Sequence, residues 1–260
     1  MVDLIIDVGN TRCKVAVFKQ NRLVAHEIVD DRVQASVEQI CQREQVRAIG
    51  LGSVGYLEDA VVVGLGRFSR LVLLSGGSPS PLRSEYTTMG SLGVDRLANA
   101  IAAHKLFPGR ATLAVDIGTC ITYDLTDGGG TYRGGAISPG PELRAKVMHT
   151  HSASLPLVGI PDRAPLIGTS TQESLAAGVF HGTVGELSGI IAAHRQQEGD
   201  LGVVLTGGGA LPYVRALKSG IFADPFLTLR GLHALLLTQL DANSLADGRN
   251  SIGGHRPGHE

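Results

Sequence analysis

Two short glycine turns carry the residue types that could bind a phosphate group. They are Asp7-Val-Gly-Asn-Thr11 and Asp116-Ile-Gly-Thr119, which share the form Asp-x-Gly followed by an amide or hydroxyl residue. A glycine directly after a strand lets backbone N–H groups approach an anion closely, and Asn or Thr side chains add donors. Lys14, just beyond the first turn, could neutralise a terminal phosphate. A third candidate turn is the triplet Gly207-Gly208-Gly209.

The aspartate that opens each turn could hold a cation beside such a phosphate. If the two halves of the chain pack around a pseudo-twofold axis, Asp7 and Asp116 face one cleft. Magnesium is the natural cation for ATP; it is bound by carboxylate oxygens and keeps several waters. Each turn taken alone is also compatible with an ordinary hairpin, whose aspartate accepts hydrogen bonds only from its own turn. The repetition of the pattern favours phosphate binding.

These turns must be positioned by apolar strands. Each follows a short apolar run, at 3–8 or 113–116, and precedes a second one, at 15–18 or 121–125. The displacement of the second copy is 116 − 7 = 109 residues, which predicts an internal duplication with a boundary near residue 110. We therefore expect domains at 1–110 and 111–240. Bulky apolar residues are few at 241–260, which predicts a disordered tail.

Apolar periodicity predicts the remaining elements. Apolar residues at helical spacing predict helices over 33–41, 56–66, 93–107, 140–152 and 172–195. Short apolar runs predict strands over 23–29, 48–51, 71–74, 131–138 and 203–206. The mixture of strands and helices in both halves indicates an α/β protein.

Composition argues against several classes of function. The 23 Lys and Arg residues nearly balance the 24 Asp and Glu residues, so binding driven by the phosphate backbone of DNA or RNA is not expected. Without tryptophan and with six Phe and five Tyr, the chain offers few rings on which bases could stack. The three cysteines are isolated, the N-terminus does not resemble a signal peptide, and no run of 18 apolar residues occurs. We expect a soluble cytoplasmic protein that binds neither nucleic acid nor membrane.

Several segments together resemble the type III pantothenate kinases, members of the acetate and sugar kinase/Hsp70/actin superfamily. The segments are 7–14, 86–96, 116–124, 134–140 and 206–210, and their order and spacing extend the resemblance over nearly the whole chain except the tail. The resemblance implies transfer of the γ-phosphoryl group of ATP to pantothenate, which gives 4'-phosphopantothenate in the first step of coenzyme A biosynthesis. It also implies a duplicated ribonuclease H-like (actin-like ATPase) fold, with a mixed five-stranded sheet in each domain and an ATP cleft between the domains.

The resemblance assigns the nucleotide and its cations to the glycine turns. Asp7 would hold magnesium, directly or through water, and Asp116 would hold a monovalent cation, potassium or ammonium. The implied ATP-binding residues are Asp7, Gly9, Asn10, Thr11, Lys14, Thr119, Gly207 and Gly208.

The resemblance also implies a substrate site, formed by Tyr86, Gly93, Val94, Asp95, Arg96 and Thr171. Pantothenate carries a carboxylate at one end and a primary hydroxyl at the other, so its site needs an anchor for the anion and an acceptor for the hydroxyl proton. Asp95 is the expected general base, and Arg96 would bind substrate through its planar fork of donors. The alternative role for Asp95 is to stabilise the start of the 93–107 helix through the helix dipole. The family further implies a homodimer with the substrate pocket near the interface.

Two rival functions remain open at this point. The first is a kinase of the same fold that acts on another small alcohol or sugar. The second is a regulatory accessory protein that keeps the fold but lacks activity. The presence of Asp7, Asp95, Arg96, Asp116 and Thr119 argues against an inactive protein.

Overall fold

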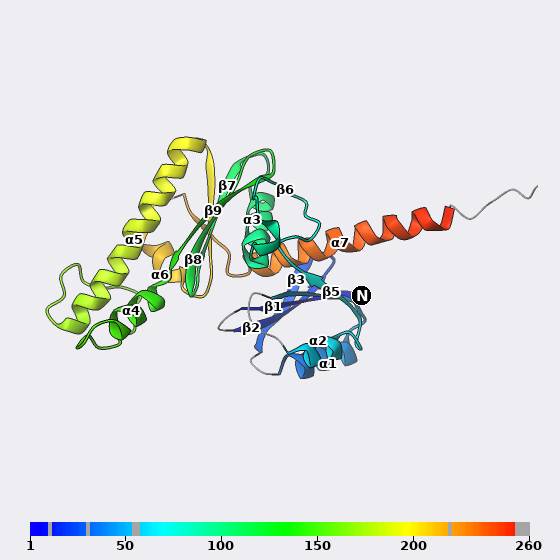
Figure 1. The fold of residues 1–260 in the computed structure, drawn as a ribbon, viewed down its shortest axis with the longest axis horizontal. Coiled ribbons are helices and arrows are strands. Elements are labelled where there is room, and N and C mark those ends of the chain that lie inside the picture. The colour runs from blue at the N-terminus through cyan, green and yellow to red at the C-terminus, as the bar shows by residue number, and fades with distance from the viewer. Residues whose placement is uncertain (10–11, 30–31, 54–57, 218–219, 253–260) are drawn as a thin grey trace, which may run out of the picture. The chain divides into compact units, whose positions relative to one another are not determined.

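The computed structural model describes residues 1–9, 12–29, 32–53, 58–217 and 220–252. The chain divides into two compact units, and each is built around one mixed β-sheet (Figure 1). The first unit comprises Met1–Pro81, Met89–Val94 and Leu232–Glu260, and the second comprises Leu82–Thr88 and Asp95–Gly231.

The sheet of the first unit has five strands in the order β3-β2-β1-β4-β5. Its strands are β1 (Val2–Val8), β2 (Cys13–Lys19), β3 (Arg22–Val29), β4 (Val46–Ser53) and β5 (Arg70–Leu74). The first three form an antiparallel meander, whereas β4 runs parallel to β1 and β5 parallel to β4. Alternate apolar residues of β1 pack against helices α1 (Val33–Arg43) and α2 (Asp59–Leu65), as the two-residue period of a strand requires.

Helix α7 (Leu227–Ile252) is held to the sheet of the first unit by a buried polar cluster. Asp3 of β1 accepts a hydrogen bond from Arg47 of β4 (Nε to Oδ1, 2.7 Å), and its Oδ2 lies 2.9 Å from Nε2 of His233 in α7. The ring of Phe18 stacks on His233 with centroids 4.1 Å apart. Burial raises the pKa of Asp3, but hydrogen bonds from Arg47 and His233 outweigh this effect and leave the pKa below its usual value. Asp3 is therefore an ionised anchor for α7.

The sheet of the second unit repeats the first with one strand added, in the order β11-β10-β7-β8-β9-β6. Its strands are β6 (Arg83–Ser84), β7 (Ala111–Ile117), β8 (Cys120–Thr126), β9 (Thr131–Pro139), β10 (Leu201–Thr206) and β11 (Phe222–Ala223). Again the first three strands of the repeat, β7 to β9, form an antiparallel meander, with β10 parallel to β7 and β11 parallel to β10. The predicted duplication and the ribonuclease H-like fold are confirmed.

The predicted count of five strands is too low for the second sheet. The additional strand is β6, which pairs parallel to β9 through only two residues. A strand of two residues produces no detectable alternation in the sequence. The 3-10 turn at Met89–Ser91 was not predicted either, because three residues are too few to show a helical period.

Helices cover both faces of the second sheet. They are α3 (Val94–Leu106), α4 (Pro141–Thr150), α5 (Thr171–Glu198) and α6 (Ala210–Ala216). Leu113 and Val115 of β7 pack in one core with Phe180 and Leu187 of α5. Ala102 and Ala103 of α3 pack with Ala114, on the opposite face of the same strand. Strand β7 is therefore buried on both faces, and this packing positions its carboxyl end.

Helix α5 is long and apolar enough to cross a membrane by length and composition alone. In this structure, 44% of the most apolar 18-residue stretch of α5 is buried inside the protein. A core helix of a soluble protein passes the same test, so the indication is weak.

The unit boundaries differ from the predicted boundary near residue 110. Residues 95–110 belong to the second unit, because α3 packs on its sheet, and the chain from Leu232 onward belongs to the first. The predicted tail also differs: α7 continues to Ile252, and only 253–260 lie outside the described residues. The spacing of a repeat locates equivalent turns, but it does not identify the sheet on which a connecting helix packs.

Candidate active site

The turn between β7 and β8 packs tightly against the turn between β9 and α4. The N–H of Gly118 donates to the carbonyl of Cys120 at 2.9 Å, and the N–H of Gly140 donates to the carbonyl of Thr119 at 2.9 Å. A Cβ on Gly140 would lie 2.1 Å from the carbonyl oxygen of Gly118, so the close approach requires glycine. Thr119 itself is exposed and accessible to a ligand.

Asp116, near the end of β7, lies against the backbone of Gly207, which follows β10. A Cβ on Gly207 would be 2.4 Å from Oδ1 of Asp116. The other oxygen, Oδ2, accepts a hydrogen bond from Nδ2 of Asn99 at 3.1 Å, and Oδ1 of Asn99 accepts one from Thr228 at 2.9 Å. Asn99 and Thr228 orient the carboxylate and were missed by sequence reasoning. The only available signal was an amide in the middle of a largely apolar helix.

Replacing Gly207 by alanine should destabilise the protein, whereas the same change at Gly208 should not. Gly207 has φ +94°, a conformation that alanine rarely adopts, and its Cβ would meet Asp116. We expect a loss of about 1–3 kcal/mol in the free energy of unfolding for Gly207→Ala, measured by urea denaturation. A Cβ on Gly208 meets nothing within 4 Å in the described structure, so Gly208→Ala should unfold like the wild type. Equal destabilisation by both variants would contradict this account.

Asp95 occupies the first turn of α3 and is half-buried. Its Oδ1 accepts a hydrogen bond from the backbone N–H of Arg96 at 2.9 Å, which holds the carboxylate in one orientation. Burial raises the pKa of Asp95, and the hydrogen bond and charge of Arg96 offset this only in part. A carboxylate with a raised pKa is a stronger base than an exposed aspartate, which suits proton transfer near neutral pH.

Arg96 is buried and held by the carboxylate of Asp124 and the ring of Tyr86. Its Nε donates to Oδ1 of Asp124 at 3.0 Å, and Nη2 lies 2.8 Å from the same oxygen. The hydroxyl of Tyr132 also donates to this oxygen, at 2.7 Å. The guanidinium carbon lies 5.8 Å from the centre of the Tyr86 ring. Arg96, Asp124 and Tyr132 are 6%, 1% and 0% exposed, so the orientation of Arg96 is fixed before any ligand arrives.

Sequence reasoning gave Asp124 and Tyr132 no role. Asp124 belongs to a segment that carried the family resemblance, and its signal was an acidic residue within a buried strand. The structure brings Tyr86, Asp95 and Arg96 together within the second unit. Thr171 is the first residue of α5 and is exposed; within the described residues, no hydrogen bond or ring contact joins it to that group. Gly93 and Val94 belong to the first unit, where the Val94 side chain is buried.

The first unit contains the other predicted nucleotide residues. The N–H of Gly9 donates to the carbonyl of Arg12 at 3.0 Å and so closes the hairpin between β1 and β2. Lys14 pairs in register with Asp7, and its Nζ lies 3.9 Å from Oδ2 of that aspartate. The Lys14 charge therefore lies next to the carboxylate. Asn10 and Thr11 lie outside the described residues.

The donor atoms at Asp7 and Asp116 fit hard cations. Within the described ranges, no three His, Cys, Asp or Glu side chains gather into a metal site. A cation at either aspartate would take its remaining ligands from backbone carbonyls, water or phosphate oxygens. Such all-oxygen sets with retained water are those that Mg²⁺ accepts.

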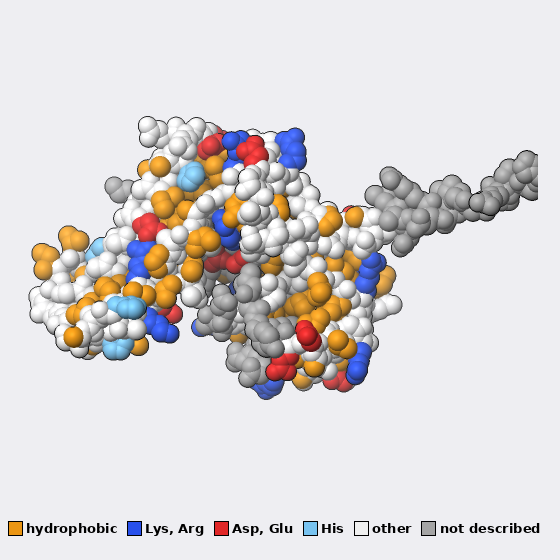
Figure 2. All heavy atoms as spheres, in the orientation of Figure 1, with side chains coloured by type: hydrophobic (Ala, Val, Ile, Leu, Met, Phe, Trp, Pro, Cys, Tyr) orange, Lys and Arg blue, Asp and Glu red, His pale blue; other side chains and the backbone are white. Residues whose placement is uncertain are grey.

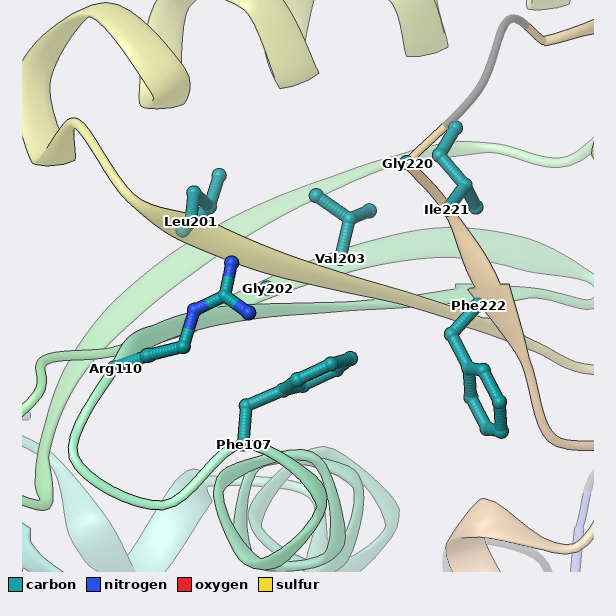
Figure 3. A pocket seen from close by; sticks show the side chains of 8 residues that line it. All are labelled: Phe107, Arg110, Leu201, Gly202, Val203, Gly220, Ile221 and Phe222. Atoms are coloured by element: carbon teal, nitrogen blue, oxygen red, sulfur yellow. The ribbon is translucent and has the colours of Figure 1, made fainter.

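Among the hollows of the described residues, two lie on the second unit. One, of about 310 Å³, is lined by Phe107, Arg110, Leu201, Gly202, Val203, Gly220, Ile221 and Phe222 (Figure 3). It contains none of the predicted site residues and lies at the start of β10, whereas the glycine turn follows the end of that strand. The other, of about 330 Å³, is lined by Leu157, Val158, Gly159, Pro161, Gln172, Glu173 and Ala176. It adjoins the start of α5, where Thr171 lies.

A family model and the curated relatives of this chain all point to one family. A family model described as type III pantothenate kinase matches residues 3–193. The type III pantothenate kinase of Bacteroides fragilis is 42% identical over 90% of this chain and 97% of the relative. That of Flavobacterium psychrophilum is 37% identical over 89% of this chain and 97% of the relative.

Solved structures resemble this chain in fold. A conserved protein from Campylobacter jejuni, described as belonging to the Baf family of transcriptional activators, gives a TM-score of 0.59 at 20% identity and covers 92% of this chain and 99% of its own. The ethanolamine utilization protein EutJ from Carboxydothermus hydrogenoformans gives a TM-score of 0.50 at 14% identity and covers 90% of each chain. At these identities the likeness concerns the fold alone.

Proposed function

The chain belongs to the type III pantothenate kinase family, and we propose that Asp95 and Arg96 carry out its reaction. It is a phosphotransferase that phosphorylates pantothenate with ATP in coenzyme A biosynthesis. The observation that carries the assignment is the fixed pair at the start of α3. A half-buried carboxylate with a raised pKa lies next to an arginine that is oriented before substrate binds.

In the proposed reaction, the Asp95 carboxylate accepts the proton of the pantothenate hydroxyl. The hydroxyl oxygen forms a bond to the γ-phosphorus while the bond from that phosphorus to the β-phosphate oxygen breaks, and ADP leaves. Phosphoryl transfer is largely dissociative, so a weak base and accurate positioning suffice. Arg96 binds the substrate, with its carboxylate as the proposed partner, through its planar fork of donors.

The glycine turns supply the proposed nucleotide contacts. Lys14 would pair with a terminal phosphate, and Thr119 would donate its hydroxyl to another phosphate oxygen. Gly207 and Gly208 would pass beneath the nucleoside, where the open space at the Gly208 Cβ position leaves room for a ligand. We propose Mg²⁺ at Asp7 and a potassium or ammonium ion at Asp116; when bound, these cations neutralise phosphate charge.

The test is ADP release with ATP and magnesium, with and without pantothenate, in potassium buffer and again in sodium buffer. Turnover that depends on pantothenate and is stimulated by potassium supports both the reaction and the cation role of Asp116. ADP release only with another alcohol would contradict the substrate while leaving the kinase assignment intact. Absence of turnover by folded protein would favour an inactive accessory protein instead.

We also propose that the protein is a homodimer that associates through the exposed face of α5. Gly178, Gly182, Gly185 and Gly189 recur at helical spacing, and a Cβ on any of them would meet nothing within 4 Å in the described structure. Leu157, Leu166 and Ile167 nearby are at least 60% exposed. Hydrophobic side chains are also visible over α4 in Figure 2. An apolar face lined with glycine allows close approach of a second copy.

The dimer has its own test. Gly182→Arg places a charge on this face without a clash inside the protomer. Light scattering should give a dimer for the wild type and a monomer for the variant. A monomeric wild type, or a variant that remains dimeric, would contradict this surface.

The cysteines support a location in the cytoplasm. In the described part of the chain, no disulfide bond joins Cys13, Cys41 and Cys120. Cysteines that are not paired in disulfides are typical of a reducing compartment.

A further inference from the structure

The carboxylate of Glu186 in α5 collects hydrogen bonds from three other elements of the second unit. Its Oε1 accepts from the hydroxyl of Tyr123 in β8 at 2.7 Å and from the hydroxyl of Ser138 in β9 at 2.5 Å. Its Oε2 accepts from Nη2 of Arg144 in α4. One side chain therefore connects β8, β9 and α4 to α5.

This cluster is ionised and largely removed from solvent. The side chains of Glu186 and Arg144 are each 21% exposed, and Tyr123 is 1% exposed. Burial raises the pKa of Glu186, but hydrogen bonds from Ser138, Arg144 and Tyr123 outweigh burial and leave the pKa below its usual value. Burial and the neighbouring Glu186 raise the pKa of Tyr123, so its hydroxyl remains a donor.

The cluster acts on the chain segment that touches the turn at Thr119. Ser138 and Pro139 are the last residues of β9, and Nε of Arg144 donates to the carbonyl of Pro139 at 2.8 Å. The next residue, Gly140, donates its N–H to the carbonyl of Thr119 at 2.9 Å. Three consecutive residues therefore join the Glu186 carboxylate to the turn between β7 and β8.

We propose that Glu186 is a positioning residue for nucleotide binding, which fixes the turn at Gly118 and Thr119 through Ser138, Arg144 and Gly140. The inference rests on the proposed contact between Thr119 and an ATP phosphate. The hydrogen bond between the two turns gives it a mechanism: a displacement of Gly140 disturbs the Thr119 carbonyl, because the Gly140 N–H donates to that oxygen at 2.9 Å.

The decisive variant is Glu186→Gln, which keeps the size of the side chain and removes the charge that holds Arg144. Nucleotide binding is measured by titration with a non-hydrolysable ATP analogue, and KM is measured separately for ATP and pantothenate. We expect the Kd for the analogue and the KM for ATP to rise about 10-fold, with the KM for pantothenate changed less than about 2-fold. A purely structural role would lower the melting temperature without this difference between the two substrates.

Two further variants complete the test. Ser138→Ala removes one donor and should give a smaller rise in the same constants, which covers the case in which Glu186→Gln fails to fold. Asp200→Asn removes a carboxylate from the exposed pair with Arg110 in the same unit and should change none of them. Equal rises in both KM values, or unchanged nucleotide affinity in a folded Glu186→Gln, would overturn the proposal.

The outcome separates this inference from the proposed function. If the wild type binds the analogue but does not phosphorylate pantothenate, the function fails and the Kd comparison still decides the role of Glu186. If the wild type does not bind the analogue, both are overturned.

Discussion

Replacement of Asp95 by asparagine should lower kcat by about 10²–10⁴-fold while both KM values stay within a few-fold of the wild type. The asparagine oxygen can still accept the hydrogen bond from the Arg96 N–H, so the helix start and the orientation of the side chain are retained. It cannot take up the proton of the substrate hydroxyl. Steady-state ADP release, with circular dichroism to check folding, measures the effect.

The helix-dipole role of Asp95 predicts a different result. Asp59 is the acidic residue in the first turn of α2 and serves as the matched control. If Asp95 only stabilises its helix, Asp95→Asn and Asp59→Asn should both cost about 0.3–1 kcal/mol of stability and leave kcat unchanged. Full turnover by Asp95→Asn would therefore remove the general base from the mechanism.

The pH dependence follows from the raised pKa of Asp95. The base works only when ionised, so kcat/KM should fall on acidification at a higher pH than an ordinary aspartate would cause. Because the pKa is higher in the folded than in the unfolded state, the folded protein binds this proton more tightly, and the group adds stability as pH falls. Protonation of Asp95 should therefore lower activity without itself unfolding the protein, as circular dichroism at each pH would show.

Replacement of Asp124 by asparagine should strongly weaken pantothenate binding and destabilise the protein. Arg96 would remain buried without its counter-ion, which costs about 3–5 kcal/mol in the free energy of unfolding. The guanidinium would also lose the carboxylate that orients it. We expect the KM for pantothenate to rise about 10–100-fold, by analogy with residues that orient metal ligands, while the affinity for nucleotide changes little. Urea denaturation and steady-state kinetics measure the two effects.

An exposed ion pair of the same unit provides the control. Glu85 pairs with Arg133, and both side chains are about half exposed. Glu85→Gln should cost no more than about 1 kcal/mol. The account of Arg96 would be wrong if Asp124→Asn matched this control in stability and in its KM for pantothenate.

Patterns in the sequence were sufficient to locate most strands and the glycine turns that follow them. Apolar periodicity located the strands on either side of Asp7 and Asp116, and the 109-residue spacing identified the duplication that both sheets share. Five segments taken together, among them the one that contains Asp95 and Arg96, indicated the family, which the relatives confirm. Strands and turns of this kind depend on short runs of the chain, and a repeated run can be recognised in a single sequence.

The packing of the fold set which distant residues contact the candidate site residues. Asp124 orients Arg96 across 28 positions of the chain, and Thr228 reaches Asn99 across 129. It also decided that α3 packs on the second sheet and that α7 is anchored to the first through Asp3. Hydrogen bonds between buried side chains form only after the strands and helices have packed, and their partners leave no periodic pattern in the sequence. For this reason the sequence offered candidates for the reacting residues, whereas it offered none for the residues that position them.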